Sequence, residues 1–168
     1  MLTSALLLLF PALMAYAAAT DLLTMTIPNR ISLALLAGFV ALVLGGSIPW
    51  GAAPWHLAAG ALVLAVCFGF FAAGWMGGGD AKLAAVTALW LGFDPLLNYL
   101  LAASLAGGAL TLGLLSIRQV PLPAFALGWT WLTRLHDRKT GIPYGIALAA
   151  AALLVYPESP VWQAGLAG

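Results

Sequence analysis

Charged residues are scarce in this 168-residue chain. Asp, Glu, Lys and Arg make up 7% of it, whereas hydrophobic residues make up 64%. A typical soluble domain is about half apolar and roughly a quarter charged. A water-soluble globule of this length leaves about a third of its unfolded surface exposed, and so few charges would not keep that surface solvated. The composition excludes a soluble domain and predicts an integral membrane protein.

Cysteine is nearly absent as well. The only one, Cys67, lies inside an apolar run, which excludes an intrachain disulfide and a cysteine-rich zinc site. The two histidines, His56 and His136, belong to no cluster with metal-ligand spacing. A net charge of +1 gives no indication of a nucleic-acid partner. We therefore expect no metal, no cofactor and no nucleic acid, and membrane lipid as the surroundings.

Long apolar runs dominate what is present. A helix needs about 20 apolar residues to cross the hydrocarbon, and prolines lie in several of the breaks between runs. The pattern predicts a single all-α membrane domain over residues 1–168, a bundle of about six transmembrane helices. Its segments are approximately 2–20, 31–46, 56–75, 83–93, 96–117 and 142–156. The segment 83–93 is short for a full crossing, so we expect it to be thinly embedded or supported by neighbours.

The basic residues predict the orientation. If every segment spans, one side holds the loops 21–30, 76–82 and 118–141, and the other holds 47–55, 94–95 and both termini. All six Lys and Arg residues fall on the first side, which the positive-inside rule makes cytoplasmic. They are Arg30, Lys82, Arg118, Arg134, Arg138 and Lys139. Both termini are therefore predicted to be non-cytoplasmic.

A cleaved signal peptide is the alternative for the first segment, because Ala15-Tyr16-Ala17 resembles a small-residue cleavage site. The basic residues that usually precede such a segment are missing. Cleavage would also remove the first span and break this charge count.

Two acidic residues stand at predicted helix ends on the cytoplasmic side. Asp21 directly follows the first apolar segment, and Asp80 follows three glycines, Gly77 to Gly79. An ionisable residue at the membrane edge is costly and points to function, and two at one depth suggest a pair. Two close carboxylates repel, so one holds a proton near neutral pH while the other acts as a base. This is the chemistry of an aspartic peptidase.

Three motifs identify a related family. Gly77-Gly78-Gly79-Asp80 fits the G-x-G-D signature of intramembrane-type aspartic peptidases. Asp21 is followed shortly by Ile27-Pro28-Asn29, and Gly141-Ile142-Pro143-Tyr144-Gly145 opens the last segment. In order, spacing and topology, nearly the whole chain resembles the type IV prepilin peptidase domain. Presenilin-like enzymes share G-x-G-D but have a Pro-Ala-Leu motif where this chain has Pro143-Tyr144-Gly145.

The resemblance implies a bacterial inner-membrane endopeptidase whose catalytic residues are Asp21 and Asp80. Its substrates would be prepilins, which carry a short basic leader before a hydrophobic N-terminal helix, cut at the cytoplasmic face. Longer, bifunctional members have an N-terminal region with paired cysteines and also methylate the new N-terminus. The chain resembles instead the short form associated with tight-adherence (Flp) pili, so methyltransferase activity is not expected.

Several neighbours are candidates for supporting or substrate-binding roles. Gly77, Gly78 and Gly79 allow close approach of backbone or substrate to Asp80. Lys82 either tunes the pair or contacts substrate, or is simply an interfacial lysine. Pro28 is expected to begin the second helix and Asn29 to hold the loop that carries Asp21. The turn Pro143, Tyr144 and Gly145 is expected to approach the pair.

Helix dipoles predict how the two aspartates differ. Asp21 lies at a helix C-terminus, where negative charge is disfavoured, and Asp80 at a helix N-terminus, where it is favoured. On this basis Asp21 holds the proton and Asp80 is the carboxylate. The loop 118–141, with its tryptophans and basic residues, is interpreted as an interfacial segment facing anionic lipid.

Two other function classes remain as alternatives. In a small transporter or channel, Asp21, Asp80 and Lys82 would belong to a polar pathway through the bundle. In a non-catalytic pilus-assembly subunit they would be structural. Both are disfavoured because no polar residues continue across the membrane from the two aspartates.

Overall fold

All six predicted segments are helical in the computed structural model, which describes residues 2–166. They form α1 (Leu2–Thr24), α2 (Asn29–Leu44), α3 (Ala53–Ala72), α4 (Gly78–Leu91), α5 (Leu96–Ile117) and α7 (Tyr144–Val155). The sequence pattern missed four short helices. These are α6 (Thr130–His136), α8 (Pro160–Leu166) and two 3₁₀ turns, η1 (Ala124–Ala126) and η2 (Tyr156–Glu158). Over residues 2–166 there is no strand, and the fold is an all-helical integral membrane bundle.

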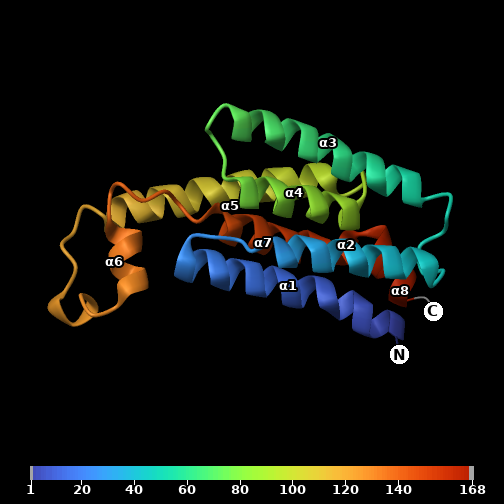
Figure 1. Ribbon diagram of the computed structural model, residues 1–168, viewed down its shortest axis with the longest axis horizontal. Helices are drawn as coiled ribbons and strands as arrows, with labels where there is room; N and C mark the ends of the chain where they lie inside the picture. Colours follow the sequence, from blue (N-terminus) through green and yellow to red (C-terminus); the bar gives the residue numbers. More distant parts are fainter. Residues whose placement is uncertain (1, 167–168) are drawn as a thin grey trace.

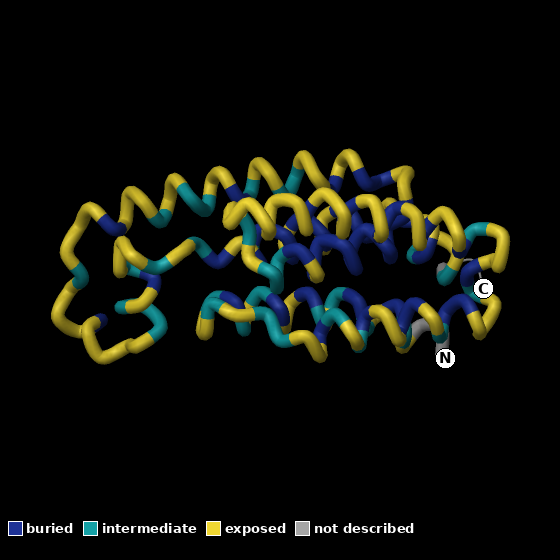
Figure 2. Tube along the Cα trace, turned by 45° about the horizontal axis from the view of Figure 1, so that its top comes forward, coloured by how far each residue is buried: buried dark blue, intermediate teal, exposed yellow. Residues whose placement is uncertain are grey.

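The two shortest of the six main helices, α4 and α7, form the centre of the bundle. α4 packs against α3 and α2, while α7 packs against α1 and α5. Every residue of α4 from Leu83 to Leu91 is buried, and the buried part of the trace runs through the middle of the bundle (Figure 2). An apolar helix of 10 to 14 residues is typical of a buried core helix. The expected support of segment 83–93 by its neighbours is therefore confirmed.

Aromatic side chains fill the core at the end of the bundle away from the two aspartates. Trp90 lies at the centre, within 5.2 Å of the Phe10 ring and 6.2 Å of the Tyr156 ring, measured between ring centroids. Its indole Nε1–H donates a 2.9 Å hydrogen bond to the backbone oxygen of Leu35, which satisfies the one polar group of the side chain. These contacts join α1, α2, α4 and η2 into one packed unit.

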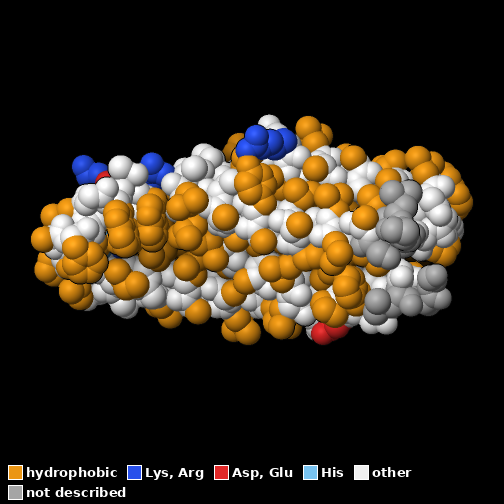
Figure 3. All heavy atoms as spheres, turned by 90° about the horizontal axis from the view of Figure 1, so that it is seen from below, with side chains coloured by type: hydrophobic (Ala, Val, Ile, Leu, Met, Phe, Trp, Pro, Cys, Tyr) orange, Lys and Arg blue, Asp and Glu red, His pale blue; other side chains and the backbone are white. Residues whose placement is uncertain are grey.

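The outer helices present apolar side chains outward. Three helical stretches are long and apolar enough to cross a membrane by length and composition: Ala5–Thr24, Ala53–Ala72 and Leu96–Ile117. Large aliphatic residues such as Leu33, Leu57, Leu105 and Leu112 are exposed. Hydrophobic side chains cover most of the face seen in Figure 3, and basic atoms occupy only a few places along one edge. Such a surface is stable only with lipid as its solvent.

The connections alternate between the two ends of the bundle as the sequence predicts. The α1–α2 and α3–α4 connections lie toward one end, and the whole segment with α6 extends beyond that end (Figure 1). The α2–α3 and α4–α5 connections lie at the opposite end, near the start of α1 and the end of α8 (Figure 1). This arrangement brings the end of α1, the start of α4 and the start of α7 toward the same end.

Candidate active site

Asp21 lies in the last turn of α1, because this helix continues four residues beyond the predicted segment. The helix ends after Thr24, where Met25 adopts a left-handed φ of 58° and its N–H donates to the backbone oxygen of Asp21 at 2.8 Å. The Asp21 side chain is only 5% exposed. A carboxylate buried this deeply needs a hydrogen-bond partner.

That partner comes from the start of α7. The backbone N–H of Gly145 donates a 2.7 Å hydrogen bond to Oδ2 of Asp21. α7 begins at Tyr144, and the residue before it, Pro143, provides no side-chain cap. Asp21 therefore accepts one of the free N–H groups in the first turn of α7, much as a capping residue would. A β-carbon on Gly145 would lie 2.7 Å from Oδ2, so only glycine allows this approach.

Asp80 lies in the first turn of α4, three residues after the N-cap residue Gly77. Its carboxylate accepts a hydrogen bond from the Gly77 backbone. This is half of a capping box, in which an acidic side chain at this position reaches back to the N-cap N–H. Asp80 thus stabilises the start of α4 in addition to any chemical role.

The triple glycine allows tight packing around Asp80. A β-carbon on Gly79 would lie 3.2 Å from Cβ of Ile27, and one on Gly78 would lie 3.3 Å from the ring of Phe71. Ile27 also faces Gly145, where a β-carbon would lie 2.7 Å from its Cδ1. Ile27 therefore sits between the starts of α4 and α7. The motif Ile27-Pro28-Asn29 contains Ile27, but the sequence alone did not predict this packing role for it.

The two aspartates line the same cavity of about 630 Å³. Its walls come from the end of α1, the α3–α4 connection, the start of α4 and the segment that leads into α7. The other lining residues are Met25, Phe70, Gly74, Trp75, Met76, Gly77, Thr140, Gly141, Ile142 and Tyr144. The structure thus brings together Asp21, Asp80, Gly77 and Tyr144 from the predicted site. Lys82, Pro28 and Asn29 do not line this cavity.

The surroundings of Asp80 favour its protonated form. Asp80 precedes the predicted membrane segment, which begins at Leu83. The pKa of Asp80 is raised from 3.8 to about 7. Burial is the largest cause, and the nearby charge of Asp21 adds to it. The hydrogen bond from Gly77 lowers the pKa and so opposes both effects. Near neutral pH the pair therefore carries one proton for much of the time.

The structure favours the opposite of the dipole-based assignment of the proton to Asp21. Both helix positions are as predicted, but Asp21 also faces the N-terminus of α7, whose N–H bonds its carboxylate. A hydrogen bond to the charged form stabilises that form. Burial outweighs the favourable dipole at Asp80. The geometry supports Asp21 as the carboxylate and Asp80 as the proton holder.

Lys82 and Asn29 bond to each other. Lys82 Nζ donates to Oδ1 of Asn29 at 2.9 Å, and both side chains are exposed. Asn29 is the first residue of α2, and Pro28 is its N-cap residue, as predicted for the start of this helix. The bond ties the α1–α2 connection, which follows Asp21, to the first turns of α4. The hydrogen-bond partner of Lys82 is thus Asn29, and neither carboxylate of the pair.

Tyr144 forms one wall of the cavity and is fixed from α5. Its hydroxyl lies 3.0 Å from Oγ1 of Thr111. Its ring covers Gly107, where a β-carbon would lie 2.8 Å from the ring. Thr111 and Gly107 are positioning residues for which the sequence carried no signal, because their contacts span 33 residues or more.

The segment 118–141 is anchored to the bundle by arginines. Arg118 is 6% exposed and donates from Nε to the backbone oxygen of Leu135 at 2.7 Å and from Nη2 to that of Gly141 at 2.9 Å. Arg134 donates to the backbone oxygen of Leu23 at 2.8 Å. The interpretation of this segment as facing anionic lipid is therefore wrong for Arg118, which faces the protein backbone and supports the cavity wall at Gly141.

No metal centre competes with this interpretation of the site. In the described part of the chain, no three His, Cys, Asp or Glu side chains gather in a position to hold a metal ion. The acidic side chains that line the cavity are Asp21 and Asp80.

Comparisons with known proteins agree on one family. The model of the type IV leader peptidase family matches residues 8–112, which include both aspartates. The chain is 34% identical over 136 residues to a prepilin leader peptidase/N-methyltransferase of Aeromonas salmonicida and, to the same extent, to one of Aeromonas hydrophila. The match covers 78% of this chain and 41% of each relative, so the chain spans about two fifths of their length. No solved structure matches the chain significantly.

Proposed function

The chain belongs to the type IV leader peptidase family, and we propose that it is a membrane aspartic endopeptidase that removes the leader from prepilins at the cytoplasmic membrane face. The leader-peptidase activity for which the relatives are named and the membrane-spanning character of the bundle support this function. The observation that carries the proposal is the shared cavity, in which carboxylates from α1 and α4 meet at one end of the bundle.

The proposed reaction starts with Asp21 ionised and Asp80 protonated. The Asp21 carboxylate takes a proton from a water molecule in the cavity, and the water oxygen attacks the scissile carbonyl carbon. The Asp80 carboxyl gives its proton to the carbonyl oxygen, which yields a gem-diol. Protonated Asp21 then gives its proton to the amide nitrogen, the C–N bond breaks, and Asp80 recovers a proton from a diol hydroxyl. The pair ends as it began.

The finer assignments extend this proposal. Short basic leaders and pilins of the tight-adherence (Flp) type are the substrates that the sequence motifs favour, in a bacterial inner membrane. The methyl transfer named for the relatives is not carried over, because the match covers 41% of their length.

The test is cleavage of a purified prepilin by the wild type, Asp21→Asn and Asp80→Asn in detergent or liposomes. We expect each variant to lose about 10²-fold to 10⁴-fold or more in kcat/KM, because general acid–base catalysis contributes that much. Asparagine at position 21 still accepts the Gly145 hydrogen bond, so a loss there reports chemistry rather than folding. Asp94→Asn is the control, since Asp94 lies in the α4–α5 connection and does not line the cavity.

Absence of cleavage by the wild type, or normal cleavage by either variant, would contradict the proposal. The transporter alternative gains no support from the structure. The space beyond the aspartates is filled by apolar and aromatic side chains such as Phe10, Leu35 and Trp90, rather than by a polar pathway.

A further inference from the structure

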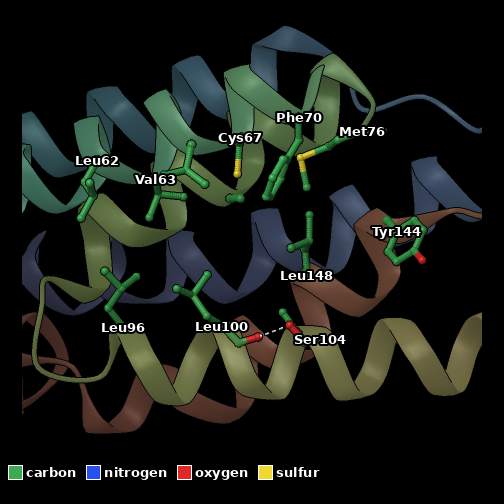
Figure 4. Close-up of a pocket in the computed structure, with 13 residues that line it drawn as sticks. Leu62, Val63, Cys67, Phe70, Met76, Leu96, Leu100, Ser104, Tyr144 and Leu148 are labelled. Carbon is green, nitrogen blue, oxygen red and sulfur yellow. Dashed lines mark hydrogen bonds between the residues drawn. The ribbon is translucent and has the colours of Figure 1, made fainter. Parts of the chain in front are cut away.

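An apolar groove runs between α3 and α5. It has a volume of about 430 Å³. Cys67 and Phe70 of α3 face Leu100 and Ser104 of α5 across it, and Leu148 of α7 lies at its base (Figure 4). Two hydroxyl side chains line it, and both already have partners: Ser104 donates to the backbone oxygen of Leu100 at 2.7 Å, and the Tyr144 hydroxyl lies 3.0 Å from Oγ1 of Thr111. The groove therefore offers a ligand apolar contact and no free polar group.

The groove exists because its two walls belong to different halves of the bundle. α3 packs chiefly against α4, and α5 chiefly against α7. The groove sides of α3 and α5 are left without a partner helix, with Leu62 and Val66 half exposed. From Leu62 to Phe70 the α3 wall extends about 12 Å at 1.5 Å per residue.

The groove continues into the cavity of the two aspartates. Phe70, Met76 and Tyr144 line both. The Tyr144 hydroxyl lies 3.0 Å from Oγ1 of Thr111 and its ring packs over Gly107, so this side chain forms the wall at the junction. One continuous surface thus changes from apolar, between the helices, to polar, at Asp21 and Asp80.

We infer that this groove binds an apolar helical segment of the protein substrate and presents the residues at the end of that segment to the two aspartates. The inference rests on the proposed function and specifies its substrate class. A peptide inside the hydrocarbon region must satisfy its own backbone groups and is therefore helical. At the aspartate end the cavity supplies polar groups and room for water, so the chain there is free to leave the helix and expose its scissile bond.

Substrate recognition then lies in the groove rather than in the charged segment 118–141. Binding by apolar contact along α3 and α5 fixes the distance between the start of the substrate helix and the cut bond. The position of the cut then depends on this distance.

The sole cysteine of the chain provides a direct test, because Cys67 lies in the groove wall. Prepilins with one cysteine at successive positions of the apolar segment are oxidised together with the full-length Asp80→Asn protein in liposomes. We expect disulfide cross-links to Cys67 at positions three or four residues apart, since one face of the substrate helix meets α3. The control is Asp80→Asn with Cys67→Ala and Leu105→Cys, which places the thiol on an exposed part of α5 outside the groove.

A second variant tests the groove by activity. Ala103→Phe fills the groove from α5, and Ala109→Phe adds the same ring to an exposed position of α5 outside it. We expect Ala103→Phe to raise KM for full-length prepilin about tenfold or more, because it displaces buried apolar area of the substrate. Ala109→Phe should leave the cleavage of full-length prepilin unchanged.

The outcomes separate this inference from the proposed function. If the wild type cleaves prepilin but Cys67 forms no periodic cross-links and Ala103→Phe is normal, the groove inference fails and the peptidase stands; a groove filled by lipid acyl chains gives this result. If Cys67 cross-links periodically but the wild type never cleaves, the peptidase proposal fails and the groove remains a helix-binding site.

Discussion

The two aspartates have the same side chain but different neighbours, and this difference sets their chemistry. Asp21 is buried and receives a backbone N–H from Gly145 of α7, while Asp80 is partly buried and receives one from Gly77 of its own helix. Helix position alone predicts the opposite order of ionisation. A contact that spans 124 residues overrides the local dipole at Asp21.

We predict that Asp80 titrates with a midpoint near 7 and that Asp21→Asn lowers this midpoint. The pKa of Asp80 is raised to about 7 by burial first and by the Asp21 charge second, so removal of that charge leaves only burial. Since Asp80 must be protonated to act as the acid, kcat/KM should fall as the pH rises through about 7. Carbon-13 NMR of aspartate-labelled protein measures the midpoint, because the chain has only Asp21, Asp80, Asp94 and Asp137.

An Asp80 midpoint near its ordinary value of 3.8, or a rise of the midpoint in Asp21→Asn, would contradict this prediction. Asp137→Asn is the control for the spectra. Its side chain accepts the backbone N–H of Lys139 in the segment beyond the bundle, so its loss should leave the Asp80 signal in place.

We also predict that Gly145→Ala loses activity about 10²-fold, as expected for a displacement of about 1 Å at a catalytic group. The new methyl group would lie 2.7 Å from both Asp21 Oδ2 and Ile27 Cδ1, so α7 and α1 must move apart. Gly113→Ala is the matched control in α5, where a β-carbon meets nothing within 4 Å. Cleavage assays and circular dichroism on both variants separate lost chemistry from lost helix. Wild-type activity of Gly145→Ala would contradict the role of this contact.

At the level of helices, the sequence predicts the main elements well because lipid imposes a simple rule on length and polarity. α5 matches its predicted bounds, and the other main helices differ by a few residues at their ends. The differences lie where polar residues continue a helix: α1 runs on through Asp21 and α4 starts before Asp80. Hydropathy ends a segment at such residues, whereas backbone hydrogen bonding does not.

The segment between α5 and α7 could not be predicted in the same way. α6 spans only Thr130–His136 and carries no long apolar run. Its position depends on Arg118 and Arg134, which bond backbone oxygens far along the chain. The positive-inside rule gives these charges a side of the membrane, and an interfacial segment gives them lipid as a neighbour, but neither pattern predicts a backbone partner.

We predict that Arg118→Met loosens this segment. The substitution keeps an unbranched apolar stem but leaves the backbone oxygens of Leu135 and Gly141 without their donor, at a cost of about 1–3 kcal/mol each. Amide hydrogen exchange over residues 130–141 should become at least about tenfold faster. Cleavage should fall as well, because Gly141 belongs to the cavity wall.

Lys139→Met is the matched control for Arg118→Met. It removes one positive charge from the same segment at an exposed side chain for which the structure shows no hydrogen bond. Equal exchange in the two variants would mean that Arg118 acts only through its charge.

For the whole molecule, the arrangement of connections places the aspartate cavity and the α6 segment toward the same end of the bundle (Figure 1). The six Lys and Arg residues are predicted to lie on this side, which the positive-inside rule makes cytoplasmic. The proposed cleavage of leaders in the cytoplasm requires this orientation. Because connections lie at both ends of the bundle, a cysteine introduced at each end can be labelled separately.

We therefore predict that a membrane-impermeant maleimide reaches Gly51→Cys from outside spheroplasts and reaches Gly128→Cys only after permeabilisation, both in a Cys67→Ala background. Gly51 lies in the α2–α3 connection and Gly128 in the segment between η1 and α6. A β-carbon at either position meets nothing within 4 Å, so both thiols fit without strain on their neighbours. Cys67→Ala leaves the introduced cysteine as the only thiol. The reverse pattern would put the two aspartates on the outer side, where they would not meet a leader before its export.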